Sequence, residues 1–183
     1  MPIPDFDHNH VLPPHLGTPV DPSQISPYYC TIFETCQRFA TSPQRISILK
    51  NYVAFRQQMT ASGIITGFQW LNGSFMEDVE TSKRRPPNDL DLITFFGGLS
   101  EDEIDNILAT FPEFGSPALS KINFHLDHYA IDYTIDPILT IEQTRYWQQL
   151  FSHNRNRVWK GILQLPLNTE IDDRQSLVYL NSL

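Results

Sequence analysis

The chain has 183 residues, of which 40% are hydrophobic and 12% aromatic, and this length and composition predict one domain with a packed core. Its formal charge of -8, from 21 acidic and 13 basic residues, disfavours bulk binding to nucleic acid or to an anionic membrane surface. No apolar run approaches the roughly 20 residues of a membrane span, and the N-terminus lacks the basic start and apolar stretch of a signal peptide.

The N-terminal segment, residues 1–26, is rich in proline and histidine and has no hydrophobic period. It is predicted to be an extended arm over the surface, in front of a single domain that spans residues 27–183. Its apolar side chains offer points at which the arm can be pinned to the core, and these are Ile3, Phe6, Val11 and Leu12.

Two helices are predicted next along the chain. The first begins at Ser26-Pro27, and the second begins at Ser42-Pro43 and ends at Ser62-Gly63. The two cysteines, Cys30 and Cys36, are expected on the first helix. Their spacing suits neither a metal pair nor a disulfide framework, so we expect reduced thiols in a cytoplasmic protein.

The rest of the chain alternates between strand and helix patterns. Strands are predicted in 64–71, 90–96, 122–135 and 158–167, and helices from the capping box at Ser100–Glu103 to before Pro112 and over 140–151. Asp136-Pro137 is interpreted as a turn, and the tail from Asn168 is ambiguous. This order predicts an α/β (α+β) fold, a small mixed sheet flanked by helices.

The strand over 90–96 opens with two carboxylates, Asp89 and Asp91. Residues at i and i+2 of a strand point to the same side, so the two aspartates share one face while Leu90 and Leu92 share the other. Two adjacent carboxylates raise each other's pKa unless a cation lies between them. Hard cations such as Mg²⁺, or Mn²⁺ in its place, suit this arrangement and can act in phosphoryl or nucleotidyl transfer.

A Gly73-Ser74 turn precedes this pair, and its backbone amides and hydroxyl can approach the phosphates of a nucleoside triphosphate. A third carboxylate on a neighbouring strand would complete a metal site. The strand pattern within 122–135 offers Asp127 and Asp132, which point to opposite faces.

The order strand, Gly73-Ser74, loop and Asp89-Leu90-Asp91 resembles the signature of the polymerase-β-like nucleotidyltransferase superfamily. Longer phrases resemble an uncharacterised bacterial family of small nucleotidyltransferase-like proteins over nearly the whole chain: "DFDHNHVLPP", "RFATSPQRISIL", "WLNGSFMEDVE", "RPPNDLDLITFF" and "FSHNRNRVWKGILQLPL". The resemblance implies the minimal nucleotidyltransferase fold. It also implies Mg²⁺-dependent transfer of a nucleoside monophosphate from a nucleoside triphosphate to a hydroxyl, with release of pyrophosphate.

The resemblance assigns a role to each matching residue. Gly73 and Ser74 match the phosphate-contacting turn, and Asp89 and Asp91 match the metal-binding pair. Asp127 is favoured as the third acid, because an aspartate after an apolar residue at a strand start resembles the superfamily's third position. Asp132 stays as the alternative.

Basic and histidine side chains near these motifs have two interpretations each. Lys83-Arg84-Arg85 either form a solvated loop tip or contact phosphates. Arg155, Arg157 and Lys160 either belong to a polar hairpin or contact phosphates. His125 and His128 are expected in packing or surface roles, because Mg²⁺ rarely takes imidazole ligands.

The chain is short for an enzyme with its own acceptor-binding domain. A protein acceptor, or a partner chain encoded beside it, is therefore expected, and a toxin–antitoxin pair is the analogy. The alternative from another class is a catalytically silent module that senses nucleotides or binds a partner on the same fold. A metal-dependent phosphohydrolase is a third hypothesis. The simplest interpretation is that Asn88-Asp89 forms only a turn and Asp91 protects a sheet edge.

Overall fold

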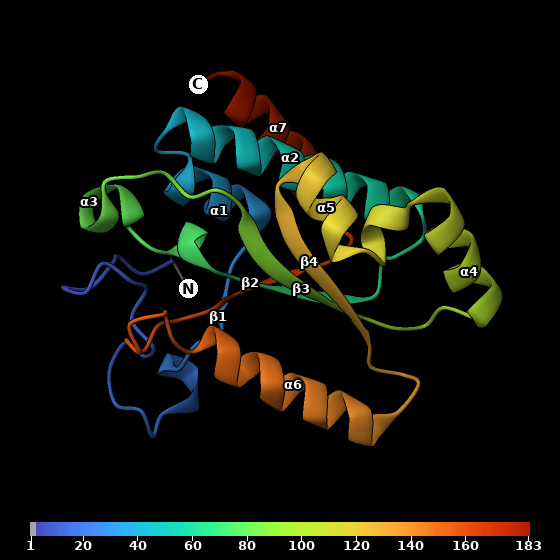
Figure 1. Cartoon of the computed structure of the whole chain (residues 1–183), viewed down its shortest axis with the longest axis horizontal. Coiled ribbons are helices and arrows are strands. Elements are labelled where there is room, and N and C mark those ends of the chain that lie inside the picture. Colours follow the sequence, from blue (N-terminus) through green and yellow to red (C-terminus); the bar gives the residue numbers. More distant parts are fainter. Residues whose placement is uncertain (1–2) are drawn as a thin grey trace.

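A computed structural model describes residues 3–183 and has a mixed five-stranded sheet with helices on both faces (Figure 1). This confirms the predicted α+β class. The strands are β1 (Tyr28–Tyr29), β2 (Gly67–Asn72), β3 (Leu90–Phe96), β4 (Leu126–Asp132) and β5 (Leu163–Pro166). The α-helices are α1 (Ile32–Phe39), α2 (Pro43–Ala61), α3 (Val79–Lys83), α4 (Glu101–Thr110), α5 (Pro117–Phe124), α6 (Pro137–Phe151) and α7 (Glu170–Asn181).

The strand order in the sheet is β1-β5-β2-β3-β4. The pairs β1–β5 and β3–β4 are parallel, and the pairs β5–β2 and β2–β3 are antiparallel. The strands β3 and β4, which carry Asp91 and Asp127, therefore run side by side in the same direction. Their ends meet at the same edge of the sheet.

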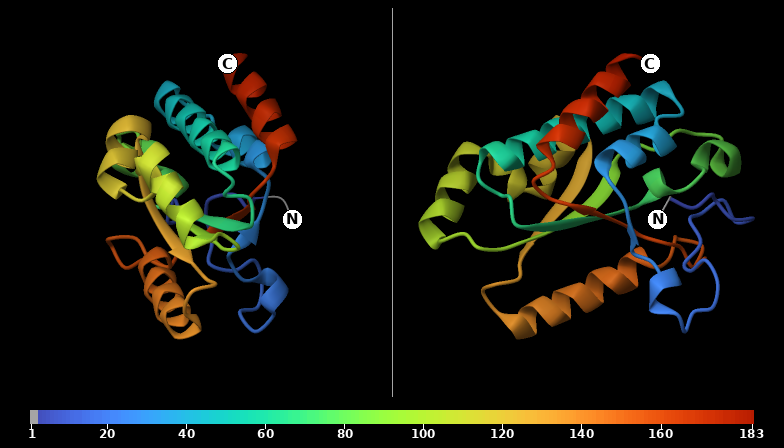
Figure 2. Two further views of the ribbon diagram at one scale, coloured as in Figure 1. Left: turned by 90° about the vertical axis from the view of Figure 1, so that its right-hand side faces the viewer. Right: turned by 180° about the vertical axis from the view of Figure 1, so that it is seen from behind.

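The helices form two unequal layers. α1, α2, α5 and α7 cover one face of the sheet, and α6 lies alone against the other (Figures 1 and 2). On β3, Leu90 and Leu92 are buried in the core beneath the larger layer, whereas Ile93 and Phe95 pack with Trp147 of α6. Because side chains alternate along a strand, Asp91 points to the α6 side of the sheet.

Local signals explain the helices that the sequence predicted. α2 begins after Ser42, whose side chain accepts a hydrogen bond from the amide of Arg45, and Pro43 occupies its first turn. α4 begins with a reciprocal capping box between Ser100 and Glu103. Both predicted starts are confirmed.

The predicted start of the first helix at Ser26-Pro27 is wrong. Tyr28 and Tyr29 form a short strand instead, which pairs with Leu163 and Gln164 of β5. The helix begins only after Thr31, where the side chains of Thr31 and Glu34 form a capping box. Tyrosine favours strands, and Tyr28 and Tyr29 find a pairing partner in β5. The start of the helix is therefore set by the cap at Thr31.

The segment before β4 holds a helix that the sequence analysis missed. α5 begins after Ser116 and ends at His125, which adopts the left-handed conformation and lies outside the strand. The interpretation of Asp136-Pro137 as a turn is also wrong. Asp136 caps α6 by accepting from the amides of Ile138 and Leu139. The ambiguous tail contains α7.

The arm is held at several points along its described residues, while residues 1 and 2 lie outside the description. Val11 and Leu12 are buried, and the carbonyl of Leu12 accepts from the amide of Gly161 at 2.7 Å. The Phe6 ring packs 6.1 Å from the ring of Phe39. Within residues 3–183, none of the helices combines the length and apolar character needed to cross a membrane.

Candidate functional site

Three aspartates converge where β3 and β4 begin. Asp91 and Asp127 are directly paired across the two parallel strands, and Asp89 lies two residues before Asp91 on the same side. All three line an open cavity of about 540 Å³, together with Gly73 and Ser74. The structure therefore brings together every residue that the sequence analysis favoured for the site.

Gly73 follows the end of β2 and has a φ angle of 76°, a backbone conformation that favours glycine. A Cβ at this position would overlap the carboxylate of Asp91. The Gly73 amide also donates to Asn72 Oδ1 at 2.8 Å, and Asn72 Nδ2 donates to the carbonyl of Gly161 at 3.1 Å. The turn is thus fixed against Asp91 by packing and by hydrogen bonds.

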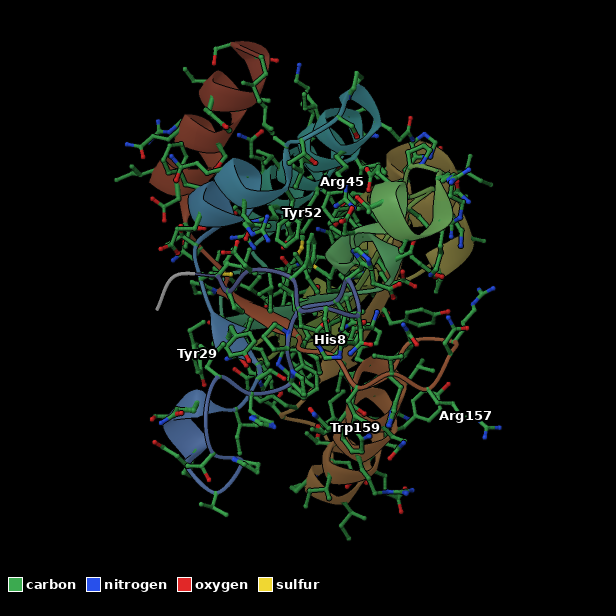
Figure 3. All side chains as sticks on the ribbon, turned by 90° about the vertical axis from the view of Figure 1, so that its left-hand side faces the viewer. His8, Tyr29, Arg45, Tyr52, Arg157 and Trp159 are labelled. Atoms are coloured by element: carbon green, nitrogen blue, oxygen red, sulfur yellow. The ribbon has the colours of Figure 1, made fainter. Side chains whose placement is uncertain are left out.

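Arg45 of α2 anchors the chain that follows the turn. Its guanidinium donates to the carbonyls of Phe75 and Glu77, each at 2.6 Å, and to both carboxylate oxygens of Glu80, at 2.7 and 2.9 Å. The side chain of Arg45 is buried inside the molecule (Figure 3). Arg45 lies on a helix that covers the face of the sheet opposite to Asp91, and it thereby fixes the position of the loop after Ser74.

Lys160 and Glu77 form a buried ion pair at the floor of the cavity. Lys160 Nζ donates to Glu77 Oε1 at 2.8 Å and to the carbonyl of Gly73 at 3.0 Å, and Lys83 Nζ lies 3.0 Å from Glu77 Oε2. Burial opposes the ionisation of Glu77, but Lys160 and Lys83 outweigh it and hold the pKa of Glu77 below its usual value. Neither Glu77 nor the contact of Lys160 with Gly73 was predicted.

The carboxyl of Asp91 is held in an unfavourable environment for a charge. Burial, followed by the negative charges of Asp89 and Asp127, raises the pKa of Asp91 to about 6. A cation close to the three carboxylates would offset this cost, which is the electrostatic condition that a metal site meets.

Lys121 supplies a positive charge that the sequence analysis missed. It projects from α5, and its Nζ lies 2.8 Å from Asp89 Oδ2 and 3.3 Å from Asp127 Oδ2. The hydrogen bond with Asp89 is the main reason that the pKa of Lys121 is raised. Its position three residues before the end of α5 depends on a helix that was not predicted, so no sequence signal marked it.

Asp132, the alternative third acid, lies away from the site. It pairs with Phe96, five residues along the strands from the Asp91–Asp127 pair, a separation of about 16 Å. Its carboxylate accepts from the amide of Thr134 at 2.8 Å. The geometry leaves Asp127 as the candidate.

Neither His125 nor His128 is among the residues that line the cavity. His125 caps α5, and His128 is fully buried, with Nε2 2.9 Å from Thr94 Oγ1. Burial lowers the pKa of His128 to about 3, so its imidazole is neutral. The expected packing role is confirmed for His128.

The donor set of the site suits a hard cation, since it consists of three carboxylates beside a polar turn. The structure does not present a preassembled metal site. Across residues 3–183 no group of three histidine, cysteine or acidic side chains has the geometry to hold an ion. The three carboxylates are the donor type that Mg²⁺ or Mn²⁺ takes, and Lys121 now lies between two of them.

Positive charge gathers on the walls of the same cavity. Five basic residues line it, and these are Lys83, Arg85, Lys121, Arg155 and Lys160. Arg157 points outward into solvent (Figure 3). Arg155 and Lys160 therefore lie where a phosphate in the cavity can be contacted. Arg157 does not, in this conformation.

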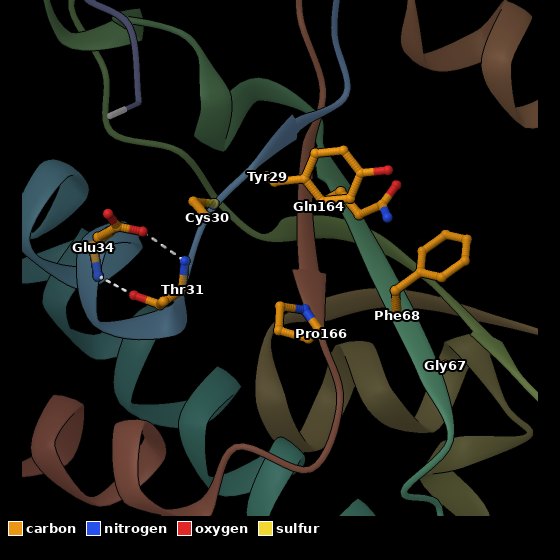
Figure 4. A pocket seen from close by; sticks show the side chains of 8 residues that line it. All are labelled: Tyr29, Cys30, Thr31, Glu34, Gly67, Phe68, Gln164 and Pro166. Carbon is orange, nitrogen blue, oxygen red and sulfur yellow. Dashed lines mark hydrogen bonds between the residues drawn. The ribbon is translucent and has the colours of Figure 1, made fainter. Parts of the chain in front are cut away.

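A second pocket of similar size, about 530 Å³, lies beside β1, β2 and β5 (Figure 4). Its one carboxylate belongs to Glu34, which accepts from the amide of Thr31 at 2.8 Å as part of the helix cap. Phe68 and Pro166 add apolar surface. Glu34 is the one carboxylate among its lining residues and no lysine or arginine joins it, so the acidic cavity is the better candidate.

The fold and the site together define a small α+β protein with an acidic centre inside a cavity walled by cations. Residues 4–166 match one family model, described as a family of unknown function (DUF6932). The chain belongs to that family. No curated protein and no solved structure matches it. The family description names no activity, so the resemblance to the nucleotidyltransferase superfamily stays a prediction.

Proposed function

We propose that the protein is a Mg²⁺-dependent nucleotidyltransferase that moves a nucleoside monophosphate from a nucleoside triphosphate to a hydroxyl acceptor. The observation that carries this proposal is the meeting of Asp89, Asp91 and Asp127 with the Gly73-Ser74 turn in one cavity. The turn supplies the Ser74 hydroxyl, and three carboxylates line the same cavity.

The charge distribution supports a phosphate ligand. The chain carries 13 basic residues against 21 acidic ones, yet five of the basic residues line this single cavity. A ligand that combines several negative charges with bound cations matches both the acidic centre and the basic walls. The cavity volume of about 540 Å³ falls within the range of small-molecule sites.

Each residue has a distinct role in this proposal. Asp89, Asp91 and Asp127 would hold the metal, which when bound would offset the charge of the phosphates and of the leaving pyrophosphate. Gly73 and Ser74 would orient the β and γ phosphates. The acceptor oxygen forms a bond to the α phosphorus while the bond from that phosphorus to the pyrophosphate oxygen breaks, and the acceptor proton passes to Asp127.

In this proposal the hydroxyl acceptor belongs to another molecule. We propose a protein acceptor or a partner chain encoded beside this one, with a toxin–antitoxin pair as the analogy. A cytoplasmic location would supply the nucleoside triphosphate and is in keeping with the two buried free thiols, Cys30 and Cys36.

A second candidate is a catalytically silent module that binds a nucleotide or a partner in the same cavity. The observation that favours it is the position of Lys121, whose ammonium forms ion pairs with two of the three carboxylates. Such a module would bind nucleotide without consuming it, and it would keep partner binding after Asp89 and Asp91 are changed to asparagine.

The test is to incubate the purified protein with each α-labelled nucleoside triphosphate and Mg²⁺, with and without cell lysate. The comparison variants are the Asp89→Asn, Asp91→Asn double variant and Asp132→Asn, which changes an acid on the same sheet away from the cavity. The proposal expects label on a macromolecule with the wild type and Asp132→Asn only. Bound but unconsumed nucleotide would favour the silent module, and labelled nucleoside di- or monophosphate without transfer would favour a phosphohydrolase.

A further inference from the structure

We propose that Lys121 is a tethered counter-cation, which occupies the cation position of the metal-free site and must leave when a divalent ion binds. This inference rests on the proposed function, because it concerns the metal site of the same cavity. It assigns to Lys121 a role in setting metal affinity rather than in the chemical step.

The contacts of Lys121 place its charge between two strands. Its Nζ is 2.8 Å from Asp89 Oδ2, just before β3, and 3.3 Å from Asp127 Oδ2, on β4. Among the residues that the structure describes, Lys121 is the one basic side chain that forms an ion pair with either carboxylate. The ammonium therefore takes the position between carboxylate oxygens that a shared metal ion would take.

The neighbouring cations are held differently, which makes Lys121 the one suited to displacement. The Lys160 side chain is 3% exposed and is bound to both Glu77 and the Gly73 carbonyl, so it is part of the floor. The Lys121 side chain is 51% exposed and contacts its partners only through the flexible end of its stem. A rotation of that stem moves the ammonium into solvent without disturbing the core.

Displacing Lys121 costs free energy, and this cost lowers the affinity of the site for a metal ion. A divalent ion gains the three carboxylates but must first break two ion pairs, each of which stabilises the metal-free state. Removing the lysine removes that competition. It also leaves Asp89 and Asp127 without their resident partner, so the empty site becomes more repulsive and binds a cation more tightly.

The experiment measures Mn²⁺ binding by titration calorimetry in the absence of nucleotide, so that the readout is independent of activity. The variants are Lys121→Gln, Lys83→Gln and the Asp89→Asn, Asp91→Asn double variant. Lys83→Gln is the matched control, since Lys83 lines the same cavity but pairs with Glu77. Circular dichroism and unfolding curves establish that each variant is folded.

The expected result is that Lys121→Gln binds Mn²⁺ about tenfold more tightly than the wild type, while Lys83→Gln changes the affinity by less than about twofold. The double variant loses binding. Equal affinities for the wild type and Lys121→Gln, with binding still lost in the double variant, would overturn the role of Lys121 and leave the metal site standing. No binding to either protein would overturn both the role and the proposed metal-dependent function.

Discussion

The carboxylate of Asp91 lies directly against the Cα of Gly73, in the space that any larger residue at position 73 would fill. Gly73 directly follows β2, whose last residue, Asn72, is opposite Asp91 of β3. Gly73 also has a φ angle of 76°. The turn and the acid therefore constrain each other, and a change at one is expected to disturb the other.

Gly73→Ala should destabilise the fold more than backbone strain alone would. The left-handed backbone costs an alanine about 1–2 kcal/mol, and displacement of Asp91 should add at least about 1 kcal/mol. Gly63→Ala is the control, because Gly63 has a φ angle of 87° but has open space where its Cβ would lie. Urea unfolding measures both. Equal losses in the two variants would show that Asp91 yields freely.

The stability of the metal-free protein should depend on the charge of Asp91. Its pKa is about 6 in the folded protein and about 4 when unfolded. Between these values Asp91 binds more protons in the folded state, so its contribution to the free energy of unfolding should fall as pH rises from about 4 to about 6 and then level off. Asp91→Asn removes this penalty.

The variant and the wild type should therefore have similar melting temperatures near pH 4, and Asp91→Asn should be the more stable near pH 7.5 in the presence of a chelator. Thermal unfolding followed by circular dichroism across this pH range measures the difference. A difference that stays constant with pH, or a less stable variant at neutral pH, would contradict the assigned environment of Asp91.

The sequence predicted the parts of the site that depend on local pattern. Alternation along β3 placed Asp89 and Asp91 on one side and the leucines on the other, because the hydrophobic core decides which face is buried. The choice between Asp127 and Asp132 depended on the register of β4 against β3, which the residues alone left open. Register is set by pairing between distant segments.

Lys121 shows why the rest of the site could not be predicted from the sequence. It lies on α5, an eight-residue helix whose ends are set by Ser116 and His125 and whose last three residues fall within the segment 122–135 that was predicted as a strand. Short helices obtain most of their stability from tertiary packing, so their own sequence carries a weak signal. The ion pair between Lys160 and Glu77 likewise joins residues that are far apart in the sequence, so it depends on the tertiary fold.

Arg45→Lys should weaken the loop that follows the Gly73-Ser74 turn. A lysine keeps the charge but lacks the planar fork that serves two carbonyls and Glu80 at once. Leaving buried carbonyls without donors should lower the free energy of unfolding by about 2–3 kcal/mol. Hydrogen exchange of the amides in residues 74–80, together with urea unfolding, measures the effect.

Arg38→Lys is the matched control for this change. Arg38 lies over the Phe6 ring at 4.7 Å, and its ion pair is with Asp5, whose side chain is fully exposed. This substitution should therefore change the stability by less than about 1 kcal/mol. If Arg38→Lys and Arg45→Lys have the same effect, Arg45 does not anchor the loop.

The buried pair of Arg56 and Asp173 should attach α7 to α2. Arg56 Nε lies 2.8 Å from Asp173 Oδ1, and both side chains are almost completely buried. Arg56→Met would leave an uncompensated carboxylate inside the protein, at a cost of about 3–5 kcal/mol. Asp173→Leu should cost less, because Arg56 still donates to Gln69, Pro166 and Thr169.

Combining the two substitutions should cost less than the sum of the single changes, because the double variant has neither unpaired charge. Urea unfolding of the wild type, the two single variants and the double variant gives the coupling energy directly. Limited proteolysis within residues 168–183 should increase most in Arg56→Met, because α7 then loses its buried partner. Additive effects would mean that Asp173 contributes no charge pairing to the attachment of α7, and that the arginine acts only through its neutral acceptors.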